Sequence, residues 1–175
     1  DLQLVTPEPI SQLMAANLSS AVQYQFGDTL SMTMRRVDTQ LPAKANPRTR
    51  AFTAELRAQN SSDEDYVAAV LKLFHQQTFI YTLQPPLLQT NPVDDFLFNT
   101  KRGFCEHYAS AFTVLMRAAG IPARVVTGYQ GGEYNSMGDY LIVRESDAHA
   151  WSEVWLDGKG WVRIDPTAAV SPTRI

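Results

Sequence analysis

The chain has 175 residues, enough for one domain with a short extension, and its 45% hydrophobic and 19% charged residues are typical of a globular protein. Its formal charge of -3 argues against a nucleic-acid partner, because nucleic-acid-binding proteins usually carry a basic patch. No apolar run approaches the roughly 18 residues that a membrane-spanning helix needs, so we expect a soluble chain.

An N-terminal extension is predicted over residues 1–45, and it contains a predicted β-hairpin. Residues 22–26 and residues 30–34 each alternate apolar with polar side chains, and Gly27-Asp28 lies between them. Two runs of period two around a glycine-containing dipeptide are typical of a hairpin. The chain begins at Asp1 without a signal peptide, which indicates a processed product or a segment of a longer protein.

Two helices are predicted next, over residues 46–59 and 62–77. Asn46 followed by Pro47 is typical of a helix start, and Ser62 with Asp65 fits a capping box. The second helix carries one apolar stripe, made by Tyr66, Val67, Val70, Leu71 and Phe74.

The only cysteine of the chain, Cys105, marks the start of the next long helix. A short extended segment is predicted at 78–83 and one helical turn at 96–98. An apolar-periodic run then continues from Cys105 to Gly120, a residue suited to end a helix. In the first turn, unpaired N–H groups and the positive end of the helix dipole favour an anion. This position therefore favours a thiolate, the nucleophilic form of cysteine.

After Pro122 the sequence becomes strand-like, with runs at 123–129, 139–145, 149–156 and 160–164. The last two runs are joined through Asp157-Gly158-Lys159, a strong tight-turn signal. Helices followed by an antiparallel meander predict an α+β fold, in which the cysteine helix packs on an antiparallel sheet.

His149 and Asp165 are the residues predicted to activate the thiol. In a hairpin that turns near Gly158, residues pair when their numbers sum to about twice the turn centre. His149 and Asp165 sum to 314, and half of that is 157. We therefore expect them opposite each other with Cβ atoms about 4.5–5.5 Å apart, close enough for an imidazole–carboxylate hydrogen bond. Together with Cys105 they make a predicted Cys-His-Asp site.

Each of these residues also has a structural interpretation. A single cysteine is often a small buried hydrophobe, a histidine at a strand start is often structural, and an aspartate before proline often forms a turn. His107 is a rival base, but it lies about 200° around the helix from Cys105, so we expect a structural role for it. A metal site would need Cys105, His107 and His149 to converge, and their spacing offers no recognisable ligand pairs, so we expect no metal.

Four motifs follow one another along the chain: Gly103–Ala109, Ala119–Arg124, His149–Val154 and Asp165–Thr167. In this order they resemble the core of the transglutaminase-like superfamily, over roughly residues 46–170. Two shorter stretches, Tyr81–Leu83 and Asp95–Phe98, are similar to bacterial membrane-anchored members of the TgpA type.

The resemblance implies a papain-like fold and acyl transfer through a thioester, with no cofactor. Cys105 would attack the side-chain amide of a glutamine in a protein or peptide, His149 would act as base and then acid, and Asp165 would orient the imidazole. An amine or water would then accept the acyl group. The oxyanion would rest on the backbone N–H of Cys105 and a second donor. Tyr81 or a nearby backbone amide is the candidate for that donor, and Trp151 is expected to help wall the site.

The resemblance also implies a catalytic domain at 46–175, placed in the periplasm between membrane spans of a parent protein. Membrane contact would then come only through parts of the parent outside this chain. Two other functions stay open at this point. The same triad serves cysteine peptidases and deamidases, because acceptor choice depends on the shape of the cleft. A non-enzymatic protein-binding module is the third hypothesis.

Overall fold

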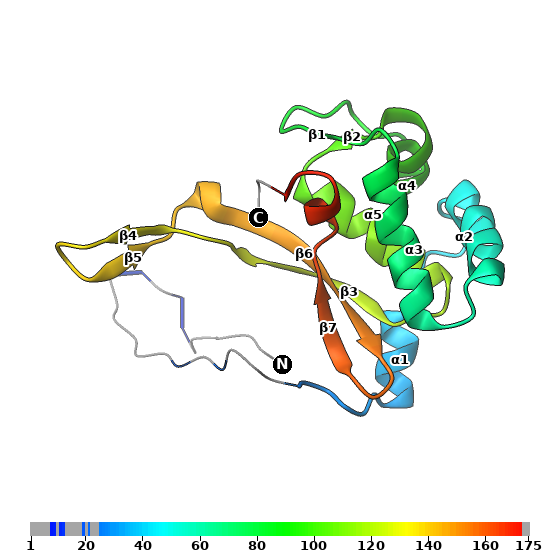
Figure 1. The fold of residues 1–175 in the computed structure, drawn as a ribbon, viewed down its shortest axis with the longest axis horizontal. Coiled ribbons are helices and arrows are strands. Elements are labelled where there is room, and N and C mark those ends of the chain that lie inside the picture. The colour runs from blue at the N-terminus through cyan, green and yellow to red at the C-terminus, as the bar shows by residue number, and fades with distance from the viewer. Residues whose placement is uncertain (1–7, 10, 13–18, 20, 22–24, 173–175) are drawn as a thin grey trace.

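The computed structural model describes residues 8–9, 11–12, 19, 21 and 25–172 (Figure 1). Its α-helices are α1 (Met32–Asp38), α2 (Pro47–Gln59), α3 (Asp63–Gln76), α4 (Pro92–Asp94) and α5 (Cys105–Ala118), and a π-helical turn (Asp95–Thr100) follows α4. Its strands are β1 (Ile80–Tyr81), β2 (Arg102–Gly103), β3 (Ala123–Tyr129), β4 (Glu133–Asn135), β5 (Tyr140–Ile142), β6 (Ala148–Leu156) and β7 (Gly160–Ile164). Two 3-10 turns flank the last two strands, at Glu145–Asp147 and Pro166–Ala169.

The fold has a helical layer and an antiparallel sheet of order β3-β6-β7, with α5 packed on the sheet. Figure 1 shows the β3–β6 ribbon running away from the helices and ending near the small β4–β5 hairpin. Alternate residues of β6, namely Ala150, Ser152 and Val154, are buried, as expected for a strand with one face on the core. The α+β prediction, with the cysteine helix against an antiparallel sheet, is confirmed.

The core lies around the middle of α5. Tyr108 is fully buried, and its ring packs in edge-to-face contacts against Phe74 and Phe96 with centroid distances of 5.8 and 5.1 Å. Such aromatic pairs add about 0.5–1.5 kcal/mol each beyond the apolar area that they bury. The first turns of α5 are therefore anchored to α3 and to the π-helical turn, which fixes the start of the helix.

The N-terminus of α2 is capped from another part of the chain. Asn46 has a left-handed backbone (φ 53°, ψ 59°), and its side chain accepts hydrogen bonds from the N–H groups of Val93 and Asp94 instead of capping its own helix. The buried Asp94 carboxylate accepts from the N–H groups of Arg48 and Thr49 at 3.0 and 2.7 Å. The predicted start of this helix is thus confirmed, but a distant carboxylate supplies its cap.

The predicted N-terminal hairpin is wrong in its second strand. Residues 32–38 form α1, because the side chain of Ser31 accepts a hydrogen bond from Met34 N and so caps a helix. Most of the predicted first strand, including Val22 and Tyr24, lies outside the described residues. The strand predicted at 139–145 is shorter than expected, and it pairs with β4, which lies in a stretch predicted to be loop.

Within the part of the chain that the structure describes, no helix combines the length and the hydropathy needed to cross a bilayer.

Candidate active site

Cys105 is the first residue of α5, as predicted. The preceding residue, Phe104, is extended (φ -121°, ψ -174°), so the helix begins abruptly at the cysteine. The N–H groups of a first helical turn have no partner inside the helix, and they point toward any anion placed there. Cys105 is 8% exposed and packs against Ala109 and Ala150. These small side chains let β6 approach the start of α5 closely.

The segment before Cys105 is held by the parallel pair β1–β2, in which Tyr81 lies opposite Gly103. His107 also contributes, because its Nδ1 lies 3.4 Å from the N–H of Phe104, and its own N–H donates to the Phe104 carbonyl. Burial lowers the pKa of His107, and the charge of Glu106 opposes this only in part. Nδ1 of a neutral His107 therefore accepts a hydrogen bond from the Phe104 N–H, in line with the structural role predicted for this histidine.

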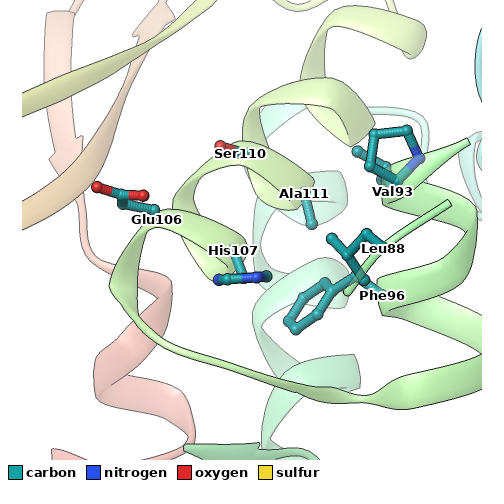
Figure 2. Close-up of a pocket in the computed structure, with 8 residues that line it drawn as sticks. Leu88, Val93, Phe96, Glu106, His107, Ser110 and Ala111 are labelled. Carbon is teal, nitrogen blue, oxygen red and sulfur yellow. The ribbon is translucent and has the colours of Figure 1, made fainter. Parts of the chain in front are cut away.

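His107 faces a different cavity from the one that Cys105 lines. That cavity has a volume of about 250 Å³ and is mainly apolar. Figure 2 shows His107, Leu88 and Phe96 around it on one side of α5, with the Glu106 carboxylate pointing away. This placement argues against His107 as the base for the thiol. Within the described residues, no three His, Cys, Asp or Glu side chains gather as metal ligands.

His149 and Asp165 form a hydrogen bond of 2.6 Å between Nε2 and Oδ2. Their side chains are only 7% and 10% exposed, so solvent weakens this contact little. The predicted register is wrong by two, however: Val154 pairs with Val162 and Leu156 with Gly160, so paired residues sum to 316. The imidazole and the carboxylate are therefore diagonal neighbours on one face of the sheet, a separation that long side chains can span.

The second oxygen of Asp165 is also engaged. Oδ1 accepts the N–H of Thr167 at 3.1 Å and thereby caps the 3-10 turn that follows β7. The hydrogen bond from Thr167 holds the Asp165 carboxylate in place, and its other oxygen accepts a hydrogen bond from Nε2 of His149. Nδ1 is then the ring nitrogen available to a thiol.

Cys105 and His149 line one cavity of about 490 Å³. The same cavity is lined by Tyr81, whose ring stacks almost parallel to that of Tyr108 (6.4 Å, 8°). The structure thus brings together three of the predicted site residues, with Asp165 directly behind His149. The cavity wall also holds Leu83, Phe104, Glu106, Thr127, Gly128, Glu145, Ser146, Ala148 and Ala150.

Trp151 does not line this cavity, contrary to its expected place in the wall. It lies behind His149 on the outer face of the sheet, with the two rings 6.3 Å apart and 22° from parallel.

Ser152 joins β6 to α5 beside the cavity, a role that was not predicted from the sequence. It is fully buried, donates to the Ala109 carbonyl at 3.0 Å and lies 3.1 Å from the Thr113 hydroxyl. These contacts hold β6 against α5 close to the cavity. The only sequence signal that could have indicated this contact is the position of Ser152 between Ala150 and Val154, on the face of β6 that alternation predicts to be buried.

Comparison with known proteins places this geometry in a family. The model of the transglutaminase-like superfamily matches residues 50–166. A Pseudomonas aeruginosa protein named protein-glutamine gamma-glutamyltransferase is 46% identical over the whole chain, which spans 26% of that protein. The Bacillus subtilis protein YebA, itself uncharacterized, is 38% identical over 73% of the chain and 18% of its own length.

A solved structure agrees with these sequence matches. The periplasmic domain of TgpA from Pseudomonas aeruginosa superposes with a TM-score of 0.82 at 50% identity, covering 84% of this chain and 51% of that one. This chain therefore spans about half of that structure and about a quarter of the Pseudomonas aeruginosa relative. The chain belongs to the transglutaminase-like superfamily and has its fold.

Proposed function

We propose that the chain is the catalytic domain, over residues 46–175, of a transglutaminase that transfers a glutamine-derived acyl group to an amine or to water. One observation carries the proposal. Cys105, at the first position of α5, shares a cavity with His149, whose other side is bonded to Asp165 at 2.6 Å. A nucleophile, a base and an orienting carboxylate in this order are the parts that covalent acyl transfer needs.

In the first half-reaction, His149 takes the thiol proton and the Cys105 sulfur attacks the carboxamide carbon of glutamine. The carbonyl oxygen becomes an oxyanion near the start of α5, where the N–H of Cys105 is directed. Tyr81 lines the same cavity and is the proposed second donor. His149 then returns the proton to the departing nitrogen, so ammonia leaves and a thioester remains.

In the second half-reaction, a primary amine or water attacks the thioester carbon. His149 accepts the proton of the attacking group, and the sulfur of Cys105 leaves as thiolate and regains the proton. An amine gives an isopeptide or amide product, whereas water gives glutamate. Asp165 keeps the ring oriented and stabilises its positive charge in both halves.

The relatives support the substrate and the location. A protein that covers the whole chain at 46% identity is named protein-glutamine gamma-glutamyltransferase, which points to a protein-bound glutamine as donor. The structure that superposes on this chain is a periplasmic domain. We propose the same compartment here, with membrane anchoring by other parts of a longer parent protein.

The test is mass spectrometry of a glutamine-containing peptide incubated with the protein and a primary amine. We expect a mass gain of the amine minus ammonia at glutamine, lost in both Cys105→Ala and His149→Ala. Lys72→Ala is the control, because Lys72 is exposed on α3, does not line the cavity and should leave activity unchanged. Conversion of glutamine to glutamate alone would favour a deamidase, and a new peptide N-terminus a peptidase. No product, or equal product from Cys105→Ala, would contradict the mechanism.

A further inference from the structure

Two side chains on the sheet beside His149, Trp151 and Arg163, are not used in the mechanism above. Trp151 follows His149 by two residues on β6, so the two side chains lie on the same side of this strand, and His149, near its start, also lines the cavity of Cys105. Arg163 on β7 pairs with Glu153, which makes it a diagonal neighbour of Trp151. The register thus places an indole between the catalytic imidazole and a guanidinium.

Distances show that these three side chains stack. The rings of Trp151 and His149 are 6.3 Å apart and 22° from parallel, and the Arg163 guanidinium carbon lies 4.2 Å from the centre of the Trp151 ring. Arg163 is held in turn, because its Nη2 donates to the Gln130 side chain at 2.9 Å and lies 3.9 Å from Oδ2 of Asp165. A guanidinium at this distance is attracted to the electron-rich face of an indole, so the two side chains hold each other in place.

A glycine makes room for the indole on the neighbouring strand. Gly128 on β3 pairs with His149, and a Cβ built at Gly128 lies 2.8 Å from Cη2 of Trp151. Any larger residue at 128 therefore displaces the ring that backs His149. The Trp151 Nε1 atom is buried without a hydrogen-bond partner among the described residues, so packing and not polar bonding holds this ring in place.

We propose that Trp151 and Arg163 are positioning residues for the reaction: together they form a backing that fixes the plane of the His149 ring. The hydrogen bond that the His149 ring donates to Asp165 fixes one ring nitrogen but leaves the ring free to swing about that contact. The indole face blocks that swing, and Arg163 holds the indole. Proton transfer depends on this alignment, since a displacement of about 1 Å costs on the order of 100-fold in rate. This inference rests on the proposed function and adds two residues to its machinery.

The same sheet provides a matched control. Arg124 lies over Trp161 with its guanidinium carbon 4.1 Å from the ring centre, and it pairs with Glu153 at 2.7 Å. This second arginine–tryptophan pair lies on the same face of the sheet, but Trp161 is paired with Trp155 near the far end of the hairpin from His149. Removing Trp161 therefore takes away a comparable stack without touching the imidazole.

The experiment compares kcat and KM for amine incorporation in Trp151→Leu, Trp151→Phe, Arg163→Gln and Trp161→Leu. We expect Trp151→Leu to lower kcat by about 10- to 100-fold with KM within about twofold, and Arg163→Gln to lower it by less. Trp151→Phe keeps an aromatic face and should recover most of kcat, and Trp161→Leu should leave kcat unchanged. Equal kcat losses in Trp151→Leu and Trp161→Leu, or a change confined to KM, would overturn the proposal.

A second readout does not depend on turnover. In the parent, the Trp151 indole should shift the NMR signals of the His149 ring, and both Trp151→Leu and Gly128→Ala should move them toward solvent-exposed values. Gly128→Ala provides the same test if Trp151→Leu does not fold, because its Cβ displaces the Trp151 ring. If the parent shows no amine incorporation while the His149 signals respond, the proposed function fails and the positioning contact stands. If the His149 signals stay unchanged in a folded variant, the positioning inference fails.

Discussion

Replacing Asp165 by asparagine isolates the hydrogen bond that orients His149. Oδ1 of Asp165 accepts the Thr167 N–H at 3.1 Å, so an asparagine that keeps this bond turns its amide NH2 toward His149. Nε2 must then accept a hydrogen bond, and the ring proton moves to Nδ1, the nitrogen that should receive the thiol proton. A hydrogen bond with a charged partner is worth about 1.5–3 kcal/mol, so we expect kcat to fall by about 10- to 160-fold.

The assay is steady-state amine incorporation by Asp165→Asn, with thermal unfolding measured on the same samples. Asp157→Asn, in the exposed β6–β7 turn, controls for the loss of one negative charge. Because asparagine can retain the Thr167 bond, Tm should stay close to that of the parent, whereas Asp165→Ala should lower both kcat and Tm. A folded Asp165→Asn protein whose kcat stays within about twofold of the parent would refute an orienting role for this carboxylate.

Three further predictions concern the framework of the site. Asp94→Ala leaves the N–H groups of Arg48 and Thr49 unpaired, and we expect the free energy of unfolding in urea to fall by about 2–4 kcal/mol; a loss under about 1 kcal/mol would show that the cap is dispensable. Burial lowers the pKa of His107 below its usual 6.5, so the unfolded chain binds more protons and the fold loses stability as pH falls below 6.5. His107→Phe should remove this part of the pH dependence in urea unfolding, and an unchanged pH dependence would contradict it. In Gly103→Ala the new Cβ lies 2.6 Å from His107 Cβ, and we expect a loss of about 1–3 kcal/mol in unfolding free energy and slower alkylation of Cys105 by iodoacetamide. Parent-like values of both would show that the start of α5 adapts.

Elements with strong local signals are the ones that the sequence predicts well. The helix of Cys105 ends where Gly120 adopts a φ of +80°, a conformation that favours glycine, and Pro122 prevents its continuation. Strands β3 and β7 match their predicted ranges because alternation and flanking turns define them. Strand β6, at Ala148–Leu156, also begins within one residue of its predicted range. The proposed thiol starts α5, the imidazole lies on β6 and the carboxylate directly follows β7, so all three candidates lie on or beside elements with strong local signals.

The errors arise where local patterns are ambiguous or partners are distant. Alternating residues at 30–34 fit a strand, but one capping hydroxyl at Ser31 decides for a helix. The register between His149 and Asp165 was predicted for a turn centred at 157, whereas the turn comprises residues 157–159. The carboxylate that caps α2 comes from a residue 45 positions beyond Thr49, and no local pattern indicates such a contact.

The contact between α5 and β6, where the Ser152 hydroxyl donates to the Ala109 carbonyl, has a consequence for how this protein loses activity on heating. The sulfur belongs to the helical layer, and the imidazole with its carboxylate belongs to the sheet, so neither layer alone holds the full set of groups proposed for catalysis. A small separation of α5 from the sheet would stop the reaction while every helix and strand stayed intact. Inactivation should therefore precede the loss of circular dichroism on heating, and enzyme assays would detect damage that spectroscopy misses.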